Sequence, residues 1–140
     1  MLFRSGGSKV VRGGGADDRV SVVAAGITLH EAVKAADELA AAGTKVRVID
    51  AYTVKPIDRA ALAAAARVTG GRLVVVEDHW AWGGIGDAVL AALALEGVGP
   101  LRYRHLAVRE MPGSGKPAEL LDAAGLSAKH IAAAVRELVA

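Results

Sequence analysis

The run Leu73-Val74-Val75-Val76 constrains the fold more than any other part of the sequence. A continuous run of large apolar residues, rich in β-branched side chains, is typical of a strand that is buried on both faces at the centre of a parallel sheet. Further strand patterns occupy residues 20–25 and 45–50, and an alternating pattern typical of an outer strand follows at 101–108. A sheet of such strands needs helices on both faces.

Helical patterns fill the segments between these strands. Thr28 and Glu31 have the spacing of a capping box, and Asp58 can cap a second helix. The helix that opens at Gly86 is apolar on nearly all sides, which predicts that a partner surface covers part of it. Ser127 precedes the last helix as a candidate cap. Strand and helix alternate, and we therefore predict an α/β fold: a three-layer α/β/α sandwich around a five-stranded, mostly parallel sheet.

A glycine triplet separates a short run of residues, 8–12, from the main body of the chain. Residues 8–12 can form a brief edge strand, and Gly13-Gly14-Gly15 follows directly. We divide the 140 residues into a tail, 1–16, that contains this edge strand, and one domain, 17–140. A chain of this length can build one hydrophobic core but not two of full size.

Composition excludes several classes of function. The 17 Lys and Arg residues are scattered among 15 acidic residues, and the net charge is +2, so we expect no nucleic-acid binding. The sequence contains no cysteine, which excludes disulfides and thiolate metal sites and fits a reducing compartment. No apolar stretch is long enough to span a bilayer, and the first residues lack the apolar core of a secretory signal. We expect a cytoplasmic protein without a membrane partner.

Candidate site residues cluster at the carboxyl end of the central strand and just after it. The segment Glu77-Asp78-His79 stands where open α/β sheets usually bind ligands, and its acids and imidazole could transfer protons or hold a metal. Gly83, Gly84 and Gly86 open the next helix, whose backbone amides could hold a phosphate. We favour the alternative that these glycines let the turn close tightly against the sheet and a neighbouring chain, because no full dinucleotide or P-loop fingerprint is present. No Ser-His-Asp arrangement and no metal-ligand spacing is recognisable.

Other polar residues give weaker indications of a ligand site. Gly26 and Asp50 mimic part of a dinucleotide site, but only one of its three glycines is present. His30 and His130 stand near helix starts, where we expect them to be solvated. We expect His105, on the outer strand, to be part of a packed face.

Several segments, in the same order along the chain, resemble the C-terminal domain of transketolases. Residues 22–32 resemble the start of that domain, and Val54-Lys55-Pro56-Ile57-Asp58 is similar to the family's Thr-Ile-Lys-Pro-Leu-Asp stretch. Residues 76–79 and 83–89 resemble its Glu-Asp-His and Gly-Gly-x-Gly-Glu-Ala-Val segments. Residues 114–121 (Ser-Gly-Lys-Pro-Ala-Glu-Leu-Leu) match the loop before the last helices. The resemblance extends from about Lys9 to the end and implies that the first strand is antiparallel to the others.

The resemblance implies a function that depends on other domains. Transketolases transfer a two-carbon ketol unit between sugar phosphates, using thiamine diphosphate and a divalent cation such as Mg²⁺ or Ca²⁺. In that family the first two domains hold the cofactor and the catalytic histidines. We therefore predict no catalytic, cofactor-binding or metal-binding residue in this chain. The predicted partners are the cofactor-binding domains or subunit and, in a homo-oligomer, further copies of this chain; Glu77, His79 and the glycine turn are candidate interface residues.

Two departures and several alternatives accompany this interpretation. Gly113 stands where the family often has arginine, and Ala81-Trp82 replaces a more usual glutamate, so we expect no anion contact at Gly113.

Deoxyxylulose-phosphate synthases and the β subunits of 2-oxo acid dehydrogenases share this domain, but residues 114–121 favour transketolase. A stand-alone phosphate- or nucleotide-binding module and a purely structural oligomerisation domain are the alternatives from other classes.

Overall fold

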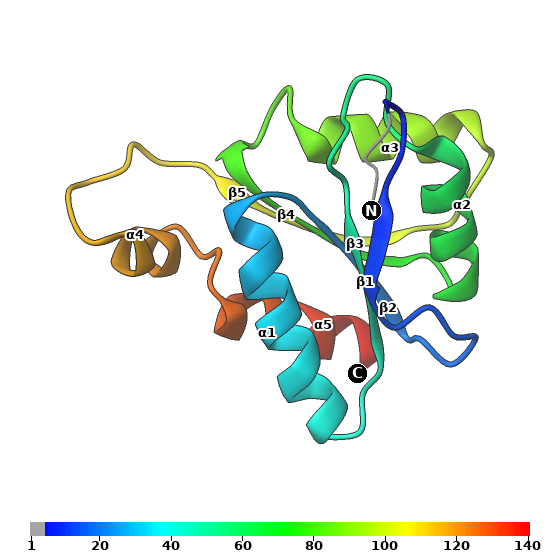
Figure 1. The fold of residues 1–140 in the computed structure, drawn as a ribbon, viewed down its shortest axis with the longest axis horizontal. Helices are drawn as coiled ribbons and strands as arrows, with labels where there is room; N and C mark the ends of the chain where they lie inside the picture. Colours follow the sequence, from blue (N-terminus) through cyan, green and yellow to red (C-terminus); the bar gives the residue numbers. More distant parts are fainter. Residues whose placement is uncertain (1–4) are drawn as a thin grey trace.

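The computed structural model describes residues 5–140, which form a five-stranded sheet in the order β1-β3-β2-β4-β5 between two layers of helices (Figure 1). β1 pairs antiparallel with β3, and the other neighbours are parallel. The predicted sandwich with an antiparallel N-terminal edge strand is confirmed. The strands are β1 (Lys9–Arg12), β2 (Val20–Ala24), β3 (Val46–Asp50), β4 (Arg72–Trp80) and β5 (Arg102–Val108).

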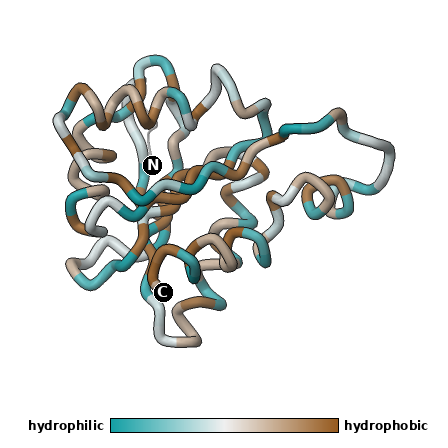
Figure 2. Tube along the Cα trace, turned by 180° about the vertical axis from the view of Figure 1, so that it is seen from behind, coloured by the Kyte–Doolittle hydropathy of each residue, from teal (hydrophilic) through white to brown (hydrophobic). Residues whose placement is uncertain are grey.

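The helices divide between the two faces of the sheet. On one face α1 and α5 pack on a core built mainly from the alternate side chains of β2 and β4. On the other face α2 and α3 cover a second core, and the central strands between the layers are the most hydrophobic part of the chain (Figure 2). The helices are α1 (Ile27–Ala41), α2 (Arg59–Val68), α3 (Ile85–Leu95), α4 (Pro117–Ala123) and α5 (Ala128–Val139).

Helix starts differ in part from the sequence prediction. Asp58 caps α2 as predicted, since its Oδ1 accepts the N–H of Ala61 at 3.2 Å. The predicted Thr28–Glu31 capping box is wrong: α1 begins at Ile27, and Thr28 lies within its first turn. Thr28 Oγ1 lies 3.0 Å from the carbonyl oxygen of Val76, and Glu31 accepts the N–H of Ala128 at 3.1 Å. Thr28 and Glu31 therefore bind residues far along the chain instead of capping the helix.

The start of α5 is a second correction. Ser127 occupies the N-cap position, but its hydroxyl does not bond a backbone amide of the helix. Its Oγ instead lies 2.9 Å from Asp122 Oδ1 and 2.8 Å from His130 Nδ1. Ser127 therefore links α5 to the end of α4. None of the described helices is long and apolar enough to cross a bilayer.

A buried ion pair fixes the segment between β1 and β2. Arg47 Nε on β3 lies 2.9 Å from Asp18 Oδ2, and the two side chains are only 10% and 1% exposed. The same carboxylate oxygen accepts the N–H of Gly14 at 2.8 Å. Because a buried charge is stable only when it is paired and hydrogen-bonded, this network holds the loop 13–19 against the sheet.

We expect Asp18→Ala to lower the free energy of unfolding by about 3–5 kcal/mol, because the buried charge of Arg47 would lose its carboxylate partner. Asp37→Ala is the matched control: Asp37 also pairs with an arginine, Arg12, but both side chains are exposed. Urea denaturation should show a large shift of the midpoint for the first variant and almost none for the second. Equal shifts would contradict the structural role given to the buried pair.

Candidate functional site

The central strand β4 is longer than its apolar run. It continues to Trp80, which pairs with Val108 of β5 after a register shift. The segment Glu77-Asp78-His79 forms the carboxyl end of this strand, as predicted. The Glu77 side chain is 2% exposed, and His79 Nδ1 lies 3.9 Å from its Oε1. Asp78 is exposed and lines a separate groove, so the three side chains do not converge on one site.

The Glu77 carboxylate occupies the N-terminus of α3. Its Oε1 accepts the N–H of Ile85 at 2.7 Å, and its Oε2 accepts the N–H of Gly86 at 2.8 Å. His105 Nε2, on β5, lies 2.5 Å from the same Oε2. The partial positive charge of the helix N-terminus and these three contacts compensate for the burial of the carboxylate. Two of the backbone amides that could have held a phosphate, those of Ile85 and Gly86, are thus already hydrogen-bonded within the chain.

The glycines of the turn let the backbone approach this carboxylate. A Cβ at Gly84 would overlap Glu77 Oε1, and a Cβ at Gly86 would lie 2.8 Å from the Tyr103 hydroxyl, too close for a real contact. Gly83 has φ 79°, and its N–H donates to Asp87 Oδ2 at 2.6 Å. These contacts favour the tight-turn interpretation over a phosphate loop.

The surroundings of Glu77 include two residues of β5. Sequence reasoning placed His105 on a packed face but missed its pairing with Glu77, because residues so far apart in sequence meet only in the parallel register of β4 and β5. The Tyr103 hydroxyl is buried and has no hydrogen-bond partner among the described residues. Burial raises the pKa of Tyr103 well above its ordinary value, and the nearby charge of Glu77 raises it further. Tyr103 therefore stays neutral, which suits a packing role.

The remaining polar candidates are dispersed. The His79 side chain is about half exposed, and its Nδ1 lies 2.8 Å from the carbonyl oxygen of Trp80. Gly26 precedes α1 with φ 60°, and Asp50 ends β3 at the same edge of the sheet, where burial raises the pKa of its carboxyl and the charge of Lys9 partly offsets this effect. His30 is exposed. No group of three or more His, Asp or Glu side chains in residues 5–140 is placed to hold a metal ion.

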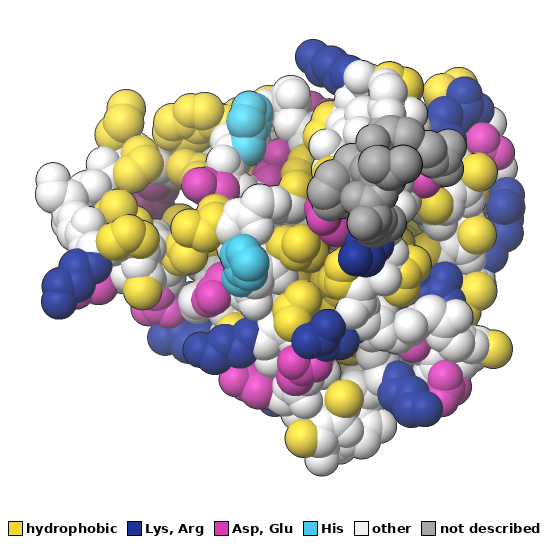
Figure 3. Space-filling model, in the orientation of Figure 1, with side chains coloured by type: hydrophobic (Ala, Val, Ile, Leu, Met, Phe, Trp, Pro, Cys, Tyr) yellow, Lys and Arg dark blue, Asp and Glu magenta, His cyan; other side chains and the backbone are white. Residues whose placement is uncertain are grey.

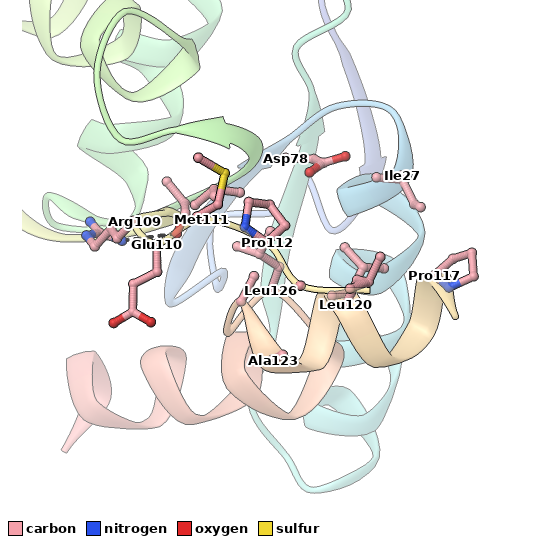
Figure 4. A pocket seen from close by; sticks show the side chains of 15 residues that line it. Ile27, Asp78, Arg109, Glu110, Met111, Pro112, Pro117, Leu120, Ala123 and Leu126 are labelled. Atoms are coloured by element: carbon pink, nitrogen blue, oxygen red, sulfur yellow. Dashed lines mark hydrogen bonds between the residues drawn. The ribbon is translucent and has the colours of Figure 1, made fainter. Parts of the chain in front are cut away.

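A groove of about 610 Å³ opens where the strands end, between α4 and the body of the domain. Met111 and Pro112, from the segment after β5, lie around the hollow with Leu120 of α4 and Leu126 before α5 (Figure 4). α4 contains no buried residue, so this helix stands away from the core. Figure 3 shows hydrophobic side chains on both sides of the hollow.

Large apolar side chains are exposed at this end of the sheet, and two of them, Ile27 and Met111, line the groove. Met111 is 82% exposed and Trp82, in the loop after β4, is 72% exposed. Monomeric proteins rarely expose such residues together unless the surface contacts another molecule. We call this set the carboxyl-edge surface. Its members are Ile27, Trp80, Trp82 and Met111.

Comparison with known proteins identifies the fold and the family. The sequence model of the family "Transketolase, C-terminal domain" matches residues 8–131. The chain belongs to the transketolase family. It is 50% identical to mouse transketolase-like protein 2 over 137 residues, covering 98% of this chain and 21% of that protein. Human transketolase is 47% identical and is matched over 98% of this chain and 22% of its own length.

A solved structure of a related protein has the same fold. The chain superposes with a TM-score of 0.88 and 37% identity on a structure named "Split gene transketolase, inactive beta4 tetramer", covering 99% of this chain and 44% of that one. The chain thus spans about a fifth of the length of the curated transketolases it matches and less than half of the split-gene chain. The family resemblance read from the sequence is confirmed, and this chain corresponds to the C-terminal domain.

We expect Gly84→Ala to lower the free energy of unfolding by about 1–3 kcal/mol, because the added methyl group would displace the Glu77 carboxylate from the start of α3. Gly113→Ala is the control, since a Cβ there meets nothing within 4 Å; its effect should stay within about 0.5 kcal/mol. Thermal or urea unfolding of both variants measures the difference. A Gly84→Ala variant as stable as wild type would show that the close approach has no role.

Proposed function

We propose that this chain is the C-terminal domain or a split subunit of a transketolase and works only beside domains that hold thiamine diphosphate and a divalent cation. In this proposal the complete assembly transfers a two-carbon ketol unit between sugar phosphates. The chain contributes buried surface and geometry to that assembly, and no reacting group. The family match and the length of the relatives support this division, because most of each relative lies outside the matched region.

The observation that carries the proposal is the carboxyl-edge surface. Met111 is 82% exposed and lines a mainly apolar groove that no described part of the chain fills, and Trp82, in the loop after β4, is 72% exposed. Exposed aromatic and methionine side chains are enriched at protein interfaces. We propose that the cofactor-binding domains or subunit cover this surface.

The residues of this chain do not fit the cofactor or its metal ion. A diphosphate would need free amides at a glycine-rich helix start, but the amides of Ile85 and Gly86 already donate to Glu77. A divalent cation would need several oxygen ligands together, and the described residues offer no such group. We therefore propose that other domains bind both groups.

Two further features belong to the same proposal. The solved relative is named as an inactive β4 tetramer, which supports the view that a chain of this kind needs a different partner for activity and can associate with its own copies. We propose a cytoplasmic location, since the chain has no cysteine and transketolase chemistry uses sugar phosphates. The alternative of a stand-alone phosphate-binding module is disfavoured by the position of Glu77.

An assay of complementation tests the proposal. The purified chain alone should not convert sugar phosphates, and calorimetric titration should detect no thiamine diphosphate binding. Adding a chain with the cofactor-binding transketolase domains should produce ketol transfer. Turnover by the isolated chain, or tight cofactor binding to it, would refute this account.

Trp82→Asp should weaken complementation about tenfold or more at limiting concentration, because it places a charge within the apolar contact. Val68→Asp is the control: Val68 is also exposed, but it ends α2 at the opposite edge of the sheet. The apparent affinity comes from titrating each variant against the cofactor-binding chain. If both variants complement like wild type, the carboxyl-edge surface is not the docking site.

A further inference from the structure

Met111 is the most exposed large apolar residue in the part of the chain that the structure describes, at 82%. It follows β5 and lines the groove together with Pro112 and Leu126 (Figure 4). Residues 109–119 are all exposed, so the whole segment around it is open to solvent. The side chain of Met111, with its sulfur atom, is therefore accessible to small molecules in solution.

The surroundings of Met111 give it no part in the hydrophobic core. It belongs to neither of the two core clusters, although a methionine usually fills irregular gaps in a core. Its thioether instead has a chemical property that an aliphatic side chain lacks, because the sulfur can be oxidised. This property distinguishes Met111 from Ile27, which lines the same groove.

No other sulfur atom within residues 5–140 competes with Met111 for an oxidant. The chain has no cysteine and two methionines, and the other methionine, Met1, lies outside the described residues. Accessible thiolates are usual targets of peroxides, and this chain has none. Oxidation of sulfur in the folded domain therefore falls on Met111.

We propose that Met111 is a reversible oxidation site whose state controls docking at the carboxyl-edge surface. The oxidant is a hydroperoxide such as hydrogen peroxide. The sulfur attacks one peroxide oxygen, the O–O bond breaks, a sulfur–oxygen bond forms, and the second oxygen leaves as water after proton transfer. The sulfur loses two electrons, and the peroxide gains them. A methionine sulfoxide reductase reverses the step with two thiols, which become a disulfide while the oxygen leaves as water.

Oxidation changes what the carboxyl-edge surface offers to a partner. The sulfoxide is polar and accepts hydrogen bonds, whereas the thioether is apolar. A contact that buries the sulfoxide oxygen without a donor loses its hydration, so docking should weaken about tenfold or more. This step rests on the proposed function, because it requires that the cofactor-binding domains cover Met111.

Peptide mass mapping tests the oxidation site. After treatment of the purified chain with dilute hydrogen peroxide, the peptide that contains Met111 should gain the mass of one oxygen atom about as fast as a short methionine peptide. The urea midpoint of the treated chain should stay unchanged, because Met111 is outside both cores. Oxidation more than about tenfold slower than in the short peptide would show a shielded sulfur and overturn the proposal.

Complementation with a cofactor-binding chain tests the consequence for docking. The peroxide is removed before mixing, and each protein is compared with its own untreated sample. Treatment should raise the apparent dissociation constant of the wild-type chain about tenfold or more, and a sulfoxide reductase with dithiothreitol should restore the untreated value. Met111→Leu is the matched control: it keeps Met1 and Trp82 but cannot form the sulfoxide at this position, so treatment should not change its affinity.

Protection by the partner gives a second measurement. When an excess of the cofactor-binding chain is added before the peroxide, Met111 should oxidise about tenfold more slowly than in the free chain, because the partner covers it. The same rate with and without the partner would show that Met111 stays open in the complex, and would contradict the link between oxidation and docking.

Two results of the complementation assay would overturn the proposal while leaving the proposed function intact. One is an oxidised wild-type chain that complements like its untreated sample. The other is a Met111→Leu variant that loses as much affinity on treatment as wild type, since oxidation elsewhere would then be the cause. An untreated wild-type chain that does not complement would instead refute the proposed function and the docking consequence together, and the mass mapping would still decide whether Met111 is the oxidation site.

Discussion

The buried carboxylate of Glu77 determines what the carboxyl edge of this sheet can do. In open α/β sheets that edge is the usual ligand site, because helix N-termini there present free amides. Here the chain supplies its own anion: Glu77 accepts the amides of Ile85 and Gly86 and contacts His105. The same contacts require glycine at the turn and join β4, β5 and α3. The amides that could have bound a phosphate instead hold these three elements together.

With these amides occupied, the accessible part of this end of the sheet offers mainly large apolar side chains, beside a few charged ones. The loop after β4 and the segment after β5 expose Trp82 and Met111, and α4 stands away from the core beside the groove. In the proposed function, the cofactor-binding domains cover this surface.

The alternation of strands and helices could be predicted from the sequence because it depends on local patterns: the Leu73-Val74-Val75-Val76 run, the Asp58 cap and the glycine turn. The family could be predicted from the order of its motifs. The Thr28–Glu31 capping box had the right spacing and failed, because both side chains found partners that only the folded chain brings near. The His105–Glu77 contact was missed for the same reason, since it depends on the register between two strands.

The most direct measurement of the central claim is a nuclear magnetic resonance titration of the amide signals of Ile85 and Gly86. The account predicts that both signals stay unshifted when inorganic phosphate or thiamine diphosphate is added, and that both amides exchange slowly with solvent, because Glu77 holds their hydrogens. Saturable shifts of these two signals would show that the amides are free to bind an anion, and would contradict the role of Glu77 as a permanent internal partner.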